Sequence, residues 1–181
     1  MPLLNTLATP YAEALLQVAE SRQETDTVAT QVRELLAVWH SSSPFREAMA
    51  SPVLEPEAKK AALAALFEGQ LTPSMQNLLK LLADRQRIAV LDAVLERFLE
   101  LYRELRRITL AKVTSATPLS DEQQVELNQK VQAISGTESV EFDLQVDPSL
   151  IGGFVVNLGS QVIDASLAGQ VRRLGLALAK V

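Results

Sequence analysis

The spacing of hydrophobic residues in this chain changes near residue 108. Before that point apolar side chains recur every three or four positions, which is the period of an amphipathic helix. Beyond it the segment SVEFDLQVD, residues 139–147, alternates apolar and polar side chains, which is the period of a strand with one buried face. The sequence therefore predicts a helical domain over residues 1–107 and a mixed domain over residues 108–181.

The first domain is expected to be a six-helix bundle with short connections between antiparallel neighbours. Prolines predict where several helices begin, because proline suits the first turn of a helix and threonine suits the cap before it. On this basis Thr9-Pro10 is expected to start the first helix, Pro56 the fourth and Thr72-Pro73 the fifth. The segment HSSSP, residues 40–44, is expected to separate the second helix from a short third one.

The second domain is expected to be a small C-terminal α/β domain with a short sheet and two helices. Segments rich in β-branched residues predict its strands, namely ITLAKVTSATP, SVEFDLQVD, GFVVNLG and QVIDAS. The second strand is expected to turn one apolar face inward, formed by Val140, Phe142, Leu144 and Val146. Ser120 and Gln123 have the spacing of a capping box, and Ser166 is expected to cap the last helix. The predicted fold class is α+β.

Composition limits the functions that this chain can have. Its 181 residues carry a formal net charge of −5, whereas nucleic-acid-binding surfaces are usually basic. The chain has no cysteine, which excludes disulfides, thiolate nucleophiles and cysteine metal sites. No apolar run approaches the roughly 18 residues of a membrane-spanning helix, and the N-terminal segment does not resemble a signal peptide. Membrane association is therefore expected to depend on a partner.

The glycine-rich stretch DPSLIGGFVVNLG, residues 147–159, raises the question of a phosphate-binding loop. Such a loop needs a lysine after its glycines, and no lysine lies between Lys130 and Lys180. A dinucleotide-binding fingerprint places its glycines between a strand and a helix, whereas here they lead into a strand. The sequence instead predicts a structural turn, and no cofactor, for the four residues Asp147, Gly152, Gly153 and Gly159.

No catalytic or metal-binding residue is predicted. His40 is the only histidine, so a histidine metal cluster is impossible, and the adjacent serines suit a helix end better than a catalytic triad, which is recognised by geometry. The polar residues are dispersed, whereas an enzyme for small molecules needs polar groups that converge on a pocket.

An apolar stripe near the N-terminus allows two interpretations. Its members recur at helical spacing and are Tyr11, Ala14, Leu15 and Val18. Such a stripe is usually core, and the residues alone favour that interpretation. The alternative is a groove that accepts an amphipathic helix from another protein.

Several segments together resemble one family over nearly the whole chain. They are PYAEALLQVA, NLLKLLADRQRIAVLDAVLERFLELY, VEFDLQVDPSLIGGFVVNLG and VIDASLAGQVRRL. The chain resembles the delta subunit of bacterial and plastid F-type ATP synthases, whose mitochondrial relative is the oligomycin-sensitivity-conferring protein. The third segment is the most specific, and the resemblance implies that its glycines are architectural.

The resemblance implies a non-catalytic stator subunit that links the catalytic head to the b-type peripheral stalk. It implies that the N-terminal helix of an alpha subunit binds between the first and fifth helices, at Tyr11, Ala14, Leu15, Val18, Leu78, Leu81 and Arg85. It implies that the C-terminal domain binds the b-type stalk subunits, for which the candidates are Val162, Ile163, Leu167, Val171 and Leu174. It also implies a peripheral protein on the cytoplasmic or stromal face of a plasma or thylakoid membrane.

A second function class stays open at this stage. A free-standing helical adaptor or chaperone-like module would also bind amphipathic helices through such a groove. It would have no reason to keep the pattern between Asp147 and Gly159.

Overall fold

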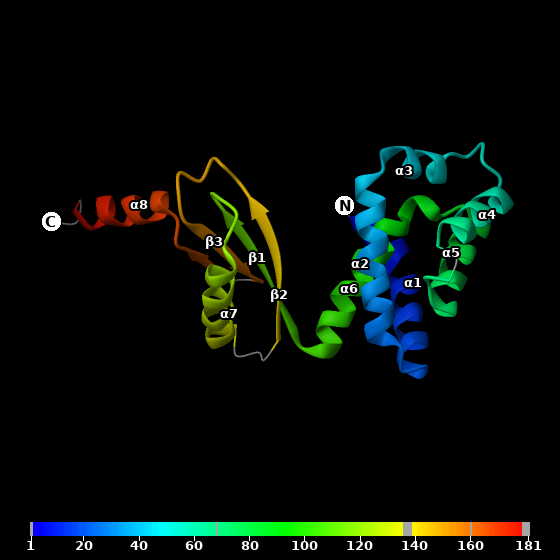
Figure 1. Cartoon of the computed structure of the whole chain (residues 1–181), viewed down its shortest axis with the longest axis horizontal. Coiled ribbons are helices and arrows are strands. Elements are labelled where there is room, and N and C mark those ends of the chain that lie inside the picture. The colour runs from blue at the N-terminus through cyan, green and yellow to red at the C-terminus, as the bar shows by residue number, and fades with distance from the viewer. Residues whose placement is uncertain (1, 68, 136–138, 160, 179–181) are drawn as a thin grey trace. The chain divides into compact units, whose positions relative to one another are not determined.

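The structure is a computed structural model, and it describes residues 2–67, 69–135, 139–159 and 161–178. The chain divides into two compact units, Met1–Glu104 and Leu105–Val181. It combines helices with a small four-stranded sheet (Figure 1), which confirms the predicted α+β class.

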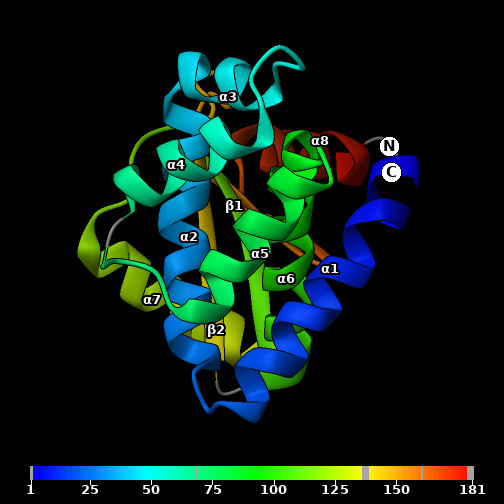
Figure 2. The ribbon, with the colours of Figure 1, turned by 90° about the vertical axis from the view of Figure 1, so that its right-hand side faces the viewer.

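Helices form the N-terminal unit. They are α1 (Pro2–Ser21), α2 (Thr25–Ser41), α3 (Ser43–Ala50), α4 (Pro56–Leu66), α5 (Pro73–Asp84), the 3₁₀ turn η1 (Ile88–Val90) and α6 (Leu91–Arg106). The helices surround a largely aliphatic core that also contains the aromatic side chains of Trp39, Phe98 and Tyr102, of which Phe98 is fully buried. Figure 2 shows α1 and α5 side by side, and this pair forms the site described below.

Hydrogen bonds hold the start of α5. Thr72 caps the helix, and its hydroxyl accepts a hydrogen bond from the amide of Met75, as the sequence predicts. The buried side chain of Gln31 on α2 donates to the carbonyl of Gln70 at 2.9 Å and accepts from the amide of Thr72 at 3.0 Å. Gln31 thereby satisfies polar backbone groups of the loop before α5, so that this loop can pack against α2 without losing hydrogen bonds.

The predicted start of the first helix is wrong. The helix begins at Pro2 and continues through Pro10, although an interior proline removes a backbone hydrogen bond and costs about 3 kcal/mol. Ala8 and Ala12, on either side of Pro10, are fully buried. Tertiary packing along this face therefore continues the helix where the local signal predicts a boundary.

Strands and two helices form the C-terminal unit. They are β1 (Ile108–Ser115), α7 (Asp121–Ser135), β2 (Ser139–Val146), β3 (Phe154–Leu158), β4 (Gln161–Asp164) and α8 (Leu167–Leu178). The sheet order is β2-β1-β3-β4, in which β1 and β2 are parallel and the other neighbours are antiparallel. The core lies between α7 and the sheet and contains Ala111, Val113, Leu127, Val131, Val156 and Leu158.

Two local predictions for this unit have different outcomes. The capping box at α7 is confirmed, because Ser120 and Gln123 exchange hydrogen bonds through their amides and side chains. The expected inward face of β2 is only half present. Val140 and Phe142 pack against the core, but Leu144 and Val146 are exposed, since the end of this edge strand extends beyond the buried cluster.

The glycine-rich stretch folds as a turn that approaches the start of α8. The Asp147 carboxylate accepts a hydrogen bond from the amide of Ser149, which forms the turn that the sequence predicts. The carbonyl of Gly152 accepts from the amide of Leu167 at 2.9 Å. Gly153 has a φ of +82°, and a Cβ there would collide with the carbonyl oxygen of Ala165. Glycine is therefore required because of both backbone conformation and close approach.

Gly153 and Gly159 form a matched pair for testing this contact. Both have positive φ, but a Cβ at Gly159 would meet no atom. We expect Gly159→Ala to cost about 1–2 kcal/mol for its left-handed backbone, and Gly153→Ala to cost about 1–3 kcal/mol more because of the collision. Urea unfolding followed by circular dichroism measures both.

The tryptophan supplies an internal control for this comparison. Trp39, the only tryptophan, lies in the N-terminal unit. The urea unfolding transition that is followed by its fluorescence is expected to stay unchanged in both glycine variants. Equal losses of stability in the two variants would contradict the assigned role of the close approach.

Candidate functional site

A groove runs along the surface between α1 and α5. We call it the α1–α5 groove; its volume is about 290 Å³, and it is lined by Tyr11, Ala14, Leu15, Val18, Arg22, Ser74, Asn77, Leu78 and Leu81. The helices run antiparallel here, because Glu24, just beyond the end of α1, accepts a hydrogen bond from Ser74 at the start of α5. At the other end, Arg87 donates to the hydroxyl of Tyr11 at 2.9 Å.

The groove is distinct from the face that α1 turns to the core. The core face consists mainly of alanines, and Ala8, Ala12 and Ala19 are fully buried. By contrast, Val18 is 40% exposed and Leu81 on the facing helix is 43% exposed. Two apolar walls around a hollow are the usual receptor for the apolar face of a helix.

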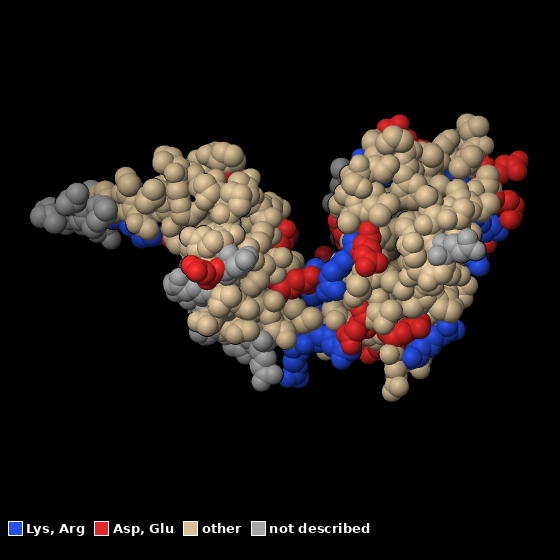
Figure 3. All heavy atoms as spheres, in the orientation of Figure 1, with Lys and Arg blue, Asp and Glu red and all other residues tan. Residues whose placement is uncertain are grey.

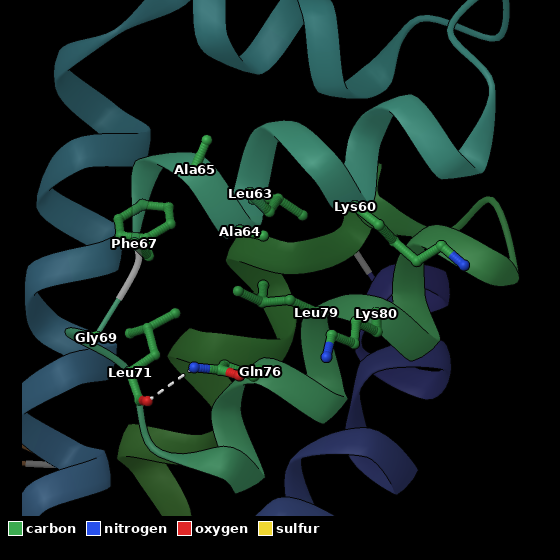
Figure 4. A pocket seen from close by; sticks show the side chains of 10 residues that line it. All are labelled: Lys60, Leu63, Ala64, Ala65, Phe67, Gly69, Leu71, Gln76, Leu79 and Lys80. Atoms are coloured by element: carbon green, nitrogen blue, oxygen red, sulfur yellow. Dashed lines mark hydrogen bonds between the residues drawn. The ribbon is translucent and has the colours of Figure 1, made fainter.

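A second hollow lies between α4 and α5, with a volume of about 270 Å³. Its lining is shown in Figure 4 and comprises Lys60, Leu63, Ala64, Ala65, Phe67, Gly69, Leu71, Gln76, Leu79 and Lys80. Lys60 on α4 joins the two helices by an ion pair of 2.7 Å to Asp84 on α5, and it forms a second ion pair of 2.7 Å to Glu57 on its own helix. Hydrogen bonds to these carboxylates, first of all to Asp84, raise the pKa of Lys60. The Gln76 side chain is also engaged, because it donates to the carbonyl of Leu71.

Asp164 anchors the first turn of α8 to the end of β4. Its carboxylate accepts hydrogen bonds from the hydroxyl and amide of Ser166 and from Arg172. The Ser166 hydroxyl in turn accepts from the amide of Gly169 at 3.0 Å, which confirms Ser166 as the cap of this helix. The hydrogen bonds from Ser166, together with the charges of Arg173 and Arg172, hold the pKa of Asp164 below its usual range.

Gly169 permits this anchor. A Cβ at that position would overlap the carboxylate of Asp164. The first turn of α8 can therefore approach Asp164 closely only because residue 169 has no side chain.

The polar residues of the HSSSP segment have structural roles. Ser42 caps α3 by accepting from the amide of Phe45, and Ser43 donates to the carboxylate of Glu47. In the described part of the chain, no group of three or more histidine, aspartate or glutamate residues is placed to hold a metal ion. None of the helices that the structure describes has the length and apolarity needed to cross a membrane.

Comparison with known proteins identifies the family. The family model described as ATP synthase delta (OSCP) subunit matches residues 7–178. The chain belongs to this family. It is 69% identical over 99% of both chains to ATP synthase subunit delta of Synechococcus sp. (strain CC9311). It is 67% identical over the whole of both chains to the organellar chromatophore subunit delta of Paulinella chromatophora.

The fold also matches a solved structure. The similar chain comes from the Toxoplasma gondii mitochondrial ATP synthase hexamer, with a TM-score of 0.76 and 23% identity over 96% of this chain and 97% of that chain. This similarity supports the fold, and the family match together with the 69% identity confirms the resemblance inferred from the sequence. A delta subunit is a structural component of the peripheral stalk of an F-type ATP synthase and is not one of its catalytic subunits.

The structure gathers most of the residues predicted for the head-binding site. Tyr11, Ala14, Leu15, Val18, Leu78 and Leu81 all line the α1–α5 groove. Arg85 does not line it and is exposed at the C-cap of α5. Sequence reasoning missed Arg22, Ser74 and Asn77, although helical spacing contains the signal. Arg22 follows Val18 by four positions, and Ser74 precedes Leu78 by four, so each continues a predicted face.

The residues predicted for the stalk site differ in their exposure to solvent. Val162, Leu167 and Val171 are exposed, whereas Ile163 is partly buried and packs against the core of the sheet. The side chain of Leu174 lies outside the described part of the structure. Leu167 and Val171 are four positions apart on α8 and so share one face of the helix.

The Asp164 anchor predicts a specific pH dependence. Since the pKa of Asp164 is lowered by folding, its contribution to stability is complete above the ordinary aspartate pKa of about 3.9 and is lost as the pH falls through the lower folded-state value. We expect the urea midpoint of the wild type to exceed that of Asp164→Asn at neutral pH.

Urea unfolding of these two proteins is followed by circular dichroism between about pH 6 and pH 2. The difference between their urea midpoints is expected to shrink over the acidic part of this range. Glu122→Gln replaces an exposed carboxylate of the same unit and serves as the matched control. A difference that stays constant with pH would show that the charge of Asp164 does not hold α8.

Proposed function

We propose that this chain ties the catalytic head of an F-type ATP synthase to its peripheral stalk. The observation that carries the proposal is an open apolar groove, between α1 and α5, in a chain of the delta family. In this proposal the six N-terminal helices act as one bundle over residues 1–107, and this bundle receives the N-terminal helix of an alpha subunit. The domain over residues 108–181 binds the b-type stalk subunits.

The groove has the chemistry needed for a helix from the head. Leu15 and Leu78 are buried in its floor, while Val18 and Leu81 remain exposed along its walls. Burying a fully exposed side chain of this kind contributes roughly 1.5–3 kcal/mol, and Val18 and Leu81, which are already more than half buried, contribute less. Association itself costs about 4–15 kcal/mol. Several anchors must therefore act together, and a second attachment through the C-terminal domain would increase the avidity of the tether.

The C-terminal domain offers an apolar surface of its own. Val162 is 63% exposed and Val171 is 68% exposed, and charged side chains are sparse on the described face of this domain in Figure 3. Val162 lies on β4, whereas Val171 shares one face of α8 with the exposed Leu167. Exposed apolar side chains that gather on one surface are typical of protein interfaces. This supports α8 and the neighbouring hairpin as the attachment point for the stalk.

The hypothesis of a free-standing helical adaptor explains the groove but not the family match over the C-terminal unit. A free-standing module would share the groove, but the family match extends through the sheet and the whole of α8, as far as residue 178. Relatives from Synechococcus and the Paulinella chromatophore support a thylakoid or plasma membrane, with the chain on the stromal or cytoplasmic face. Attachment to that membrane would depend on the assembled complex.

Ala14→Asp tests the groove. Ala14 lines it and is exposed, so an aspartate would fold normally but would place a charge against the apolar face of a bound helix. We expect binding of a peptide from the N-terminus of the alpha subunit to weaken at least tenfold, which corresponds to about 1.4 kcal/mol. Titration calorimetry with the full chain measures the affinity.

Gln17→Asp is the matched control, because Gln17 is exposed on the same helix outside the groove lining. It makes the same charge change and is expected to leave the affinity within about twofold. If Ala14→Asp, with the circular dichroism of a folded chain, bound the peptide as tightly as the wild type, the head would have to attach elsewhere.

Val171→Asp tests the stalk surface in the same way. We expect it to weaken binding of the b-type subunits at least tenfold, since it places a charge on the apolar face of α8. Gln170→Asp, at the neighbouring exposed position, is expected to have a smaller effect. Co-sedimentation of purified stalk subunits with each variant measures the difference. Unchanged binding by Val171→Asp would move the stalk site away from this face.

A further inference from the structure

Arg22 places an unpaired positive charge at one end of the α1–α5 groove. It lines the groove and is exposed, and within the part of the chain that the structure describes its guanidinium has no hydrogen-bond or ion-pair partner. The described residues show no ion pair between Arg22 and the nearby Glu24, whose carboxylate accepts from the Ser74 hydroxyl. Arg22 is therefore available to a ligand.

Arg87 supplies positive charge at the opposite end. Its Nη1 donates to the hydroxyl of Tyr11 at 2.9 Å, and Tyr11 belongs to the groove lining. A hydroxyl is neutral, so this hydrogen bond orients the guanidinium without neutralising it. Arg85, exposed at the C-cap of α5, adds to the positive charge near this end.

The groove contrasts with the rest of the chain in its charge. The chain has a formal net charge of −5, yet none of the residues that line the groove is acidic. An apolar floor with a cation at each end is complementary to an apolar stripe with a carboxylate at each end.

The spacing of the two cations defines the length of the complementary segment. Arg87 meets the groove at Tyr11 on α1, and Arg22 directly follows the last residue of that helix. The backbones of Tyr11 and Arg22 are eleven positions apart, which corresponds to about three helical turns or roughly 16 Å. Two residues eleven positions apart in a bound helix lie on the same face, because three turns contain about 10.8 residues. A helix that lies along the groove can thus present a carboxylate to each end without losing its apolar contacts.

We propose that the α1–α5 groove selects a helix whose apolar stripe is bracketed by two acidic side chains about eleven residues apart. One carboxylate pairs with Arg22, and the other pairs with Arg87 beside the Tyr11 hydroxyl. This inference rests on the proposed function, in which the groove receives a helix, and adds the charge pattern by which that helix is recognised.

A set of synthetic peptides tests the pattern on the full chain. Each has eighteen residues and the same leucine and alanine stripe, and the two bracketing positions carry glutamate, glutamine or lysine. Fluorescence polarisation measures the affinities at about 50 mM salt, where exposed charges are weakly screened. We expect the peptide with two glutamates to bind most tightly. Each change to glutamine should weaken binding about two- to fivefold, the range of one exposed ion pair.

Charge reversal on the protein identifies which cation acts. Arg22→Glu is expected to weaken binding of the two-glutamate peptide about tenfold. The same variant is expected to bind tightly the peptide that carries lysine in place of the glutamate that faces residue 22. Arg87→Glu should likewise weaken binding of the two-glutamate peptide and favour the peptide with lysine at the position that faces residue 87. Lys80→Glu makes the same change on the other side of α5, where Lys80 lines the α4–α5 hollow, and should leave the ranking of the peptides unchanged.

The outcomes separate this inference from the proposed function. Equal affinities across the peptide set, or tighter binding of the lysine peptides, would overturn the bracketed pattern. So would failure of every synthetic peptide while the alpha-subunit peptide still binds, and the proposed function would then stand. Failure of the alpha-subunit peptide to bind a folded chain would instead reject the groove as the head site.

Discussion

The site depends on the way in which α1 packs through small residues. Ala8, Ala12 and Ala19 are fully buried, so the helix rests on the core through its smallest side chains. Leu15 is buried in the floor of the groove, and Val18 is left partly exposed at the surface beside α5. If large residues occupied the inner face, the helix would stand further from the core. The depth and the walls of the groove follow from this division of one helix into two apolar faces.

Local signals predict much of the fold. The Thr72 cap, the Ser120–Gln123 capping box and the Ser166 cap all appear in the structure, because each depends on residues within one helical turn. The start of α1 could not be found in this way, since the local preference of Pro10 is overruled by packing on either side of it. The exposed end of β2 has the same origin, because alternation defines a face but not the extent of the layer that covers it.

The candidate site could be predicted only in part from the residues. Periodicity locates the stripe that contains Tyr11 and Val18, but it does not distinguish a groove from a core, since both need apolar side chains. The family resemblance favours the groove, and in the structure the stripe lines a hollow beside α5. The hydrogen bond from Arg87 to Tyr11 joins residues far apart in the sequence, and no local sequence pattern predicts it. The charge of the groove is therefore a property that only the folded arrangement reveals.

The attachment of α8 also determines how the C-terminal unit bears a mechanical load. A force applied to α8 reaches the sheet through the Asp164–Ser166 anchor and through the hydrogen bond from Leu167 to Gly152. The force enters the sheet at two points, the end of β4 and the turn that leads into β3. These two strands are neighbours and pair with each other. From β3 the antiparallel ladder passes the load to the central strand β1. Pulling the helix away thus requires the hydrogen bonds that join it to two different strand ends to break together, so the strain is shared between two strands of the sheet.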